Sequence, residues 1–230
     1  MASHAETRGG GHGHAETLAL RTQFDTAAQQ REASTFGMWV FLITEVMFFG
    51  GMFLMYTVYR MIYPGVFAVA SGSLNATLGA VNTAVLLCSS YTMVLAVRAS
   101  QTGWRKGIVV FVILTVLLGG VFLSVKAVEW TDKWHHHHIP GPSFHLEGTP
   151  QQGQAQLFFS LYFAMTGLHA LHMVVGVGIM TFILFQAWKG VYTPEYNTPV
   201  DIAGLYWHFV DIVWIFLFPL LYLIDRHLPK

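Results

Sequence analysis

The segment "YWHFVDIVWIFLF" (206–218) decides the fold class of this 230-residue chain. It lies in an apolar run, 202–224, long enough to cross a hydrocarbon core of about 30 Å, which takes about 20 helical residues. His208 and Asp211 are the only histidine or charged residues in that run. A charged side chain at the bilayer centre costs about 2.5–3.5 kcal/mol. We therefore expect both side chains to face protein rather than lipid.

The composition is that of an integral membrane protein. Hydrophobic residues make up 54% of the chain and charged residues only 10%, which is too apolar for an ordinary soluble domain. The 12 basic and 12 acidic residues balance, and no basic run indicates a nucleic-acid surface. Cys88 is the single cysteine, so the chain alone can build neither a disulfide framework nor a thiolate metal site.

Five apolar segments are long enough to span a membrane, and they occupy about 36–59, 74–97, 107–125, 158–188 and 202–224. The sequence therefore predicts an all-α, polytopic membrane protein, a bundle of five transmembrane helices with its two termini on opposite sides.

The segments outside the spans are predicted to differ in character. Residues 1–35 form a polar extension with no small-residue cleavage pattern after the first apolar segment, so that segment is expected to stay in the protein. Residues 126–155 are predicted to form a long outer loop. Seven of the 12 Lys and Arg residues fall on the side of the N-terminus, which favours a cytoplasmic N-terminus and an outside C-terminus.

The ionisable residues away from the helix ends are predicted to lie in one buried layer: Glu45, His169, His172, His208 and Asp211. Counting about 1.5 Å per residue from the inner boundary puts Glu45 and Asp211 at about 14 Å and His208 at about 9 Å. The two histidines of the fourth span fall at a similar level. Each pair three residues apart shares a helix face, so we expect a cluster with Glu45.

This cluster has two interpretations. Two histidines and two carboxylates could hold a metal ion when they converge from facing helices. A charge-neutralised polar network that fixes helix packing is favoured, because three-residue spacings are ordinary one-face neighbours. Haem ligation is disfavoured, since two ligands on one helix cannot lie on opposite faces of an iron. Glu45 suits either a proton-handling group or a hydrogen-bonded structural carboxyl, and the residues alone leave both open.

Two further groups of polar residues lie near the predicted outer loop. Lys126 and Glu129 are three residues apart and are expected to form an interfacial ion pair. The four consecutive histidines at 135–138 could chelate a metal. A solvated loop is favoured, because neighbouring loop residues share no fixed geometry.

Five motifs carry a family resemblance, and they occur in the family's order: "GMWVFLITEVMFFGG" (37–51), "NTAVLLCSS" (82–90), "LGGVFLSVKAVEW" (118–130), "FAMTGLHALHMVVG" (163–176) and "YWHFVDIVWIFLF" (206–218). Over about 36–224 the chain resembles subunit III of the haem-copper oxidases, the cytochrome c oxidase subunit III family, in its five-helix form.

The resemblance implies a non-catalytic subunit of a proton-translocating respiratory oxidase in the cell (inner) membrane. Such a subunit packs on subunit I, with subunit II and others nearby, binds phospholipid, and supports proton uptake and turnover stability. It has no catalytic residue and no metal of its own, and haem and copper belong to its partners. The family includes cytochrome c oxidases, quinol oxidases and nitric oxide reductase-associated relatives, and Glu45 favours the cytochrome c type.

The resemblance also implies roles for individual residues. Glu45 matches the family's carbodiimide-reactive acid, and the family's buried polar positions correspond to His169, His172, His208 and Asp211. The family pattern therefore favours a polar network over a metal site.

Overall fold

The computed structural model describes residues 23–135, 139–141 and 144–224. The helices in that part of the chain are α2 (Ala27–Ile62), α3 (Pro64–Gly72), α4 (Ala76–Gln101), α5 (Arg105–His135), α6 (Gln152–Lys189) and α7 (Thr198–Tyr222). Five of them, all except the short α3, are long and apolar enough to cross a membrane. The predicted all-α bundle of five transmembrane helices is confirmed.

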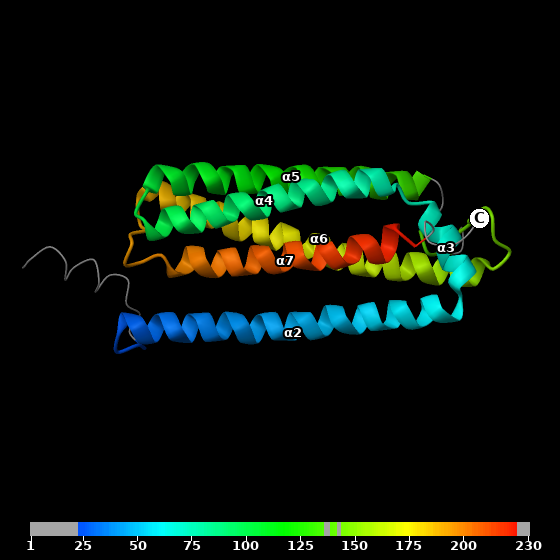
Figure 1. Cartoon of the computed structure of the whole chain (residues 1–230), viewed down its shortest axis with the longest axis horizontal. Coiled ribbons are helices and arrows are strands. Elements are labelled where there is room, and N and C mark those ends of the chain that lie inside the picture. The colour runs from blue at the N-terminus through cyan, green and yellow to red at the C-terminus, as the bar shows by residue number, and fades with distance from the viewer. Residues whose placement is uncertain (1–22, 136–138, 142–143, 225–230) are drawn as a thin grey trace, which may run out of the picture.

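The five long helices run along the long axis of the molecule, with α4 and α5 side by side and α2 along the outside of the bundle (Figure 1). Helices α2 and α7 both start at one end and finish toward the other, as an odd number of spans requires. In the most apolar stretch of α7, 56% of the residues are buried, whereas in that of α2 only 11% are. Helix α7 is thus the central helix, and α2 is the peripheral one.

Helix α2 begins earlier than its apolar residues suggest. It starts at Ala27, inside the segment 1–35 that was predicted to be a polar extension. The Thr26 hydroxyl accepts a hydrogen bond from the Gln29 backbone N–H (3.2 Å), and Gln29 accepts one in return from the Asp25 N–H (2.9 Å). Such reciprocal capping satisfies N–H groups that a helix start leaves free, so the helix extends through polar residues.

Helix α5 also continues past its predicted end at residue 125, and part of the predicted outer loop 126–155 is therefore helical. The helix runs to His135 because polar residues of its last turns find partners on other elements. Lys133, for example, donates to the Ser73 carbonyl (2.7 Å). At the start of α6, the Gln152 amide donates to the carbonyls of Leu146 (2.8 Å) and Thr149 (2.7 Å), which ties the residues just before the helix to its first turn.

Two tryptophans of α7 form the centre of the core. Trp207 and Trp214 are both fully buried. The Trp207 indole N–H donates to the Ser89 hydroxyl (3.1 Å), and that of Trp214 donates to the Thr83 hydroxyl (3.0 Å). A Cβ added at Gly119 would lie 2.8 Å from the Trp207 ring. The absence of a side chain at this position of α5 therefore makes room for the ring.

We predict that Gly119→Val destabilises the bundle by about 2 kcal/mol, because overpacking a filled core costs about 1–3 kcal/mol. The Trp207 ring cannot move away without losing its bond to Ser89. Gly120→Val is the matched control, since nothing lies within 4 Å of a Cβ at Gly120. Thermal unfolding in detergent measures both variants. Equal losses of stability would show that the gap at Gly119 is not needed.

Candidate functional site

Glu45 of α2 and His172 of α6 lie in contact between the peripheral helix and the bundle. Glu45 Oε2 lies 3.3 Å from His172 Nε2, and the two side chains are 19% and 14% exposed. The sequence predicted that both would belong to a buried polar set, and the structure brings these two together.

The hydrogen bond of His172 to its own helix decides which ring nitrogen faces Glu45. His172 Nδ1 lies 2.9 Å from the Leu168 carbonyl oxygen, which only accepts, so Nδ1 carries a hydrogen. Nε2 then carries either a lone pair, if the ring is neutral, or a second hydrogen, if the ring is an imidazolium. A lone pair facing a carboxylate is repulsive, so the contact is attractive only when a proton lies between Nε2 and the carboxyl group of Glu45. A proton placed between Nε2 and the carboxyl group would join the two side chains, whichever of them carried it.

Aromatic residues fix the position of this pair. Phe49 of α2 packs edge-on against the His172 ring, with centroids 5.5 Å apart. The Tyr206 hydroxyl of α7 donates to the His172 backbone carbonyl (3.0 Å), and the Tyr206 ring stacks on Phe41 at 6.2 Å. Three helices thus hold the pair in place.

His208 and Asp211 lie at a second place, between α7 and α4. His208 Nδ1 is 2.8 Å from the Ser90 hydroxyl. Asp211 is 2% exposed, and the Ser90 hydroxyl also interacts with its carboxyl. Within the described part of the chain, the Asp211 oxygens make no hydrogen bond of ordinary geometry.

His169 lies at a third place, inside the bundle. It is 1% exposed, and its ring packs edge-on against Phe122 (5.5 Å) and beside Trp214 (5.2 Å). Neither ring nitrogen has a hydrogen-bond partner among the described residues.

The single cluster expected from depth counting is therefore divided into three parts. Residues at the same depth can face different directions, and two residues three positions apart on a helix differ by about 60° around its axis. His172 consequently faces α2, whereas His169 faces Phe122 and Trp214. Among the described residues, no group of three or more His, Cys, Asp or Glu side chains is arranged to hold a metal ion. Of the four-histidine run, 136–138 lie outside the described residues, and His135 is the last residue of α5.

Lys126 and Glu129 of α5 form the ion pair that their spacing suggested, and it is enclosed by protein. Lys126 Nζ lies 2.9 Å from Glu129 Oε2, and both residues are about 95% buried. Lys126 also donates to the Tyr222 hydroxyl (2.6 Å), and the hydroxyls of Tyr222 and Tyr162 donate to Glu129 Oε1. The ammonium group lies 4.6 Å from the centre of the Trp214 ring. These five residues join α5, α6 and α7, and we call them the ion-pair hub.

Comparison with known proteins identifies the family. Residues 20–225 match the family described as cytochrome c oxidase subunit III. This chain belongs to that family. The Corynebacterium diphtheriae cytochrome c oxidase subunit 3 is 34% identical over 87% of this chain and 96% of its own length. The Bacillus subtilis quinol oxidase subunit 3 is 32% identical over 91% of this chain and 96% of its own length. The Pseudomonas putida cytochrome bo(3) ubiquinol oxidase subunit 3 is 30% identical over 84% of this chain and 86% of its own length. Subunits of cytochrome c oxidases and of quinol oxidases therefore both occur among the relatives of this chain.

The tyrosines of the ion-pair hub were missed by sequence reasoning. Tyr162 and Tyr222 lie on α6 and α7, far in sequence from the residues that they contact. Tyrosines near helix ends are also typical membrane-interface anchors, so their type carried no separate signal. One clue was available: Lys126 and Glu129 sit at the end of an apolar span, where a buried pair needs additional hydrogen-bond donors.

We predict that Lys126→Met destabilises the protein by about 3–5 kcal/mol, because removing one partner leaves a buried carboxylate without its counter-charge. Unfolding by SDS titration in mixed micelles measures the loss. The double variant Lys126→Met/Glu129→Gln should recover most of it. Lys106→Met, at an exposed site on the same helix, should stay within about 0.5 kcal/mol of the parent. A single variant no less stable than the Lys106 control would contradict the role of the hub.

Proposed function

We propose that this chain is the accessory subunit III of a proton-pumping haem-copper terminal oxidase, and that it packs on subunit I, binds phospholipid and supports proton uptake. Family membership supports the assignment to an oxidase complex. The observation that carries the proton-related part is the Glu45–His172 contact, because that contact is attractive only with a bound proton.

The site is suited to hold and release a proton rather than to perform redox chemistry. Its side chains lie between the peripheral α2 and the bundle rather than in the closely packed core, and each of them can carry a proton. We propose that this chain contributes no redox centre and that haem and copper reside in its partner subunits, with this chain bound to subunit I and close to subunit II. His169 could offer a ring nitrogen to a metal, but it is surrounded by Phe122 and Trp214, neither of which is a usual ligand.

The electron donor is proposed to be cytochrome c, with quinol as the second candidate. Glu45 favours cytochrome c as the donor. Quinol is supported by the Bacillus subtilis quinol oxidase subunit, which is as similar to this chain as the Corynebacterium diphtheriae cytochrome c oxidase subunit is. Phospholipid binding rests on the family resemblance and on the apolar exterior of α2, where Phe36, Met47 and Leu54 are all more than 60% exposed.

We predict that the tagged chain, expressed in membranes of its host, copurifies with a haem-containing partner that oxidises cytochrome c. An optical spectrum and metal analysis of the complex, and of the chain after its separation, test this. Haem and copper should remain with the partner. Stoichiometric iron or copper retained by the separated chain would contradict the accessory role, and oxidation of quinol but not of cytochrome c would establish the second candidate.

We predict that Glu45→Gln assembles normally but lowers oxidase turnover several-fold at alkaline pH, where protons are scarce. The glutamine amide can still donate to His172 Nε2, so the contact is kept while the exchangeable acid is lost. Glu32→Gln, on the same helix at an exposed site, is the control and should match the parent at every pH. Parental turnover of Glu45→Gln across the pH range would leave Glu45 with a structural role only.

A further inference from the structure

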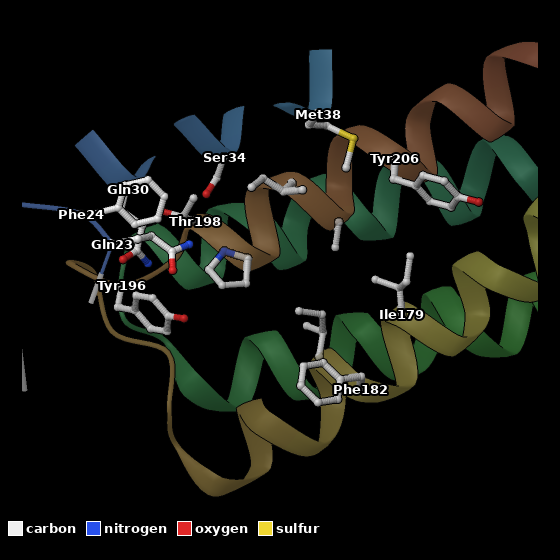
Figure 2. A pocket seen from close by; sticks show the side chains of 14 residues that line it. Gln23, Phe24, Gln30, Ser34, Met38, Ile179, Phe182, Tyr196, Thr198 and Tyr206 are labelled. Atoms are coloured by element: carbon white, nitrogen blue, oxygen red, sulfur yellow. The ribbon is translucent and has the colours of Figure 1, made fainter. Parts of the chain in front are cut away.

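A pocket of about 510 Å³ lies at the start of α2, between α2, α6 and α7. Figure 2 shows the side chains that line it. The volume is in the range of about 300–1,000 Å³ that is usual for small-molecule sites. The pocket includes none of the ionisable residues that the sequence singled out, and it adjoins the Glu45–His172 pair only through Tyr206.

Most polar side chains of this pocket lie at one end of it, together with the Phe24 ring (Figure 2). Gln23, Gln30, Tyr196 and Thr198 gather near the ends of the helices, whereas Met38 and Ile179 lie further into the bundle (Figure 2). Ser34 lies between the two zones. The pocket therefore offers hydrogen-bonding groups at its mouth and an apolar wall deeper in, which is the arrangement that an amphiphile fits.

The lining carries no charge. None of its described residues is Asp, Glu, Lys, Arg or His. Arg31 and Asp201 adjoin the lining residues Gln30 and Ile202, but they are paired with each other at 3.5 Å. A phosphate head group would therefore find no cation among the residues that line the pocket. Amide and hydroxyl groups can instead satisfy an uncharged head that carries hydroxyl or carbonyl oxygens.

We propose that this pocket binds one uncharged amphiphile. Its hydroxyl- or carbonyl-bearing head lies among the polar groups near Gln30 and Thr198, and its apolar chain lies along Ile179 and Phe182 toward Tyr206. The charge of the head is what separates this ligand from the phospholipids of the proposed function. The inference does not rest on that function, since binding is measured directly and without oxidase activity.

Native mass spectrometry of the full-length chain tests this with two lipids of the same acyl chain. The probes are 1-monooleoylglycerol and 1-oleoyl-lysophosphatidylglycerol, and the second adds a charged phosphate. We expect the chain to bind a single monooleoylglycerol about tenfold more tightly than the charged lipid. Ser34→Trp fills the pocket from α2 and should weaken monooleoylglycerol binding about tenfold. Ala33→Trp, at the neighbouring exposed position, should leave binding unchanged.

Ala203→Leu fills the same pocket from α7 and gives an independent reading if the Ser34 variant does not fold. Loss of binding in either filled variant, with retention in Ala33→Trp, supports the proposal. Equally tight binding of the charged lipid would overturn it, because the pocket would then be an unselective lipid groove. Absence of monooleoylglycerol binding to the parent chain, or unchanged binding in both filled variants, would also overturn it.

Discussion

The rest of the structure depends on the close packing of α7 against its neighbours. In lipid, apolar side chains gain nothing by leaving their surroundings, so helices are held together by close contact and by hydrogen bonds between them. Helix α7 uses both. Its buried tryptophans donate to hydroxyls of α4, and a glycine of α5 leaves room for the Trp207 ring. The other helices arrange themselves around this central one.

The ion-pair hub adds a polar connection at one end of that core. A buried ion pair is costly unless its hydrogen-bonding capacity is satisfied, and here tyrosine hydroxyls from two other helices complete it. The pair therefore connects α5 to α6 and α7 at a fixed register. Trp214 links the hub to the core, because its ring lies beside both the Lys126 ammonium group and the His169 ring.

The site for which we propose a proton-related role lies instead at the periphery, where α2 meets the bundle. The contacts of α2 with its neighbours are sparse, and the Glu45–His172 pair is more exposed than the ion-pair hub. Tyr206 connects this edge to the pocket, because its ring lines the pocket and its hydroxyl holds the His172 backbone.

The sequence by itself determined the all-α class, the five spans, the family, and which ionisable residues are placed away from the helix ends. Hydropathy and spacing suffice for these, because the thickness of the bilayer sets the length of each helix. Only the tertiary structure decided the partners: Glu45 with His172, His208 with Ser90, and the ion pair with two tyrosines. Depth is a one-dimensional quantity that can be counted along the chain. The direction that each side chain faces depends on the rotation of its helix, which packing between segments far apart in sequence sets.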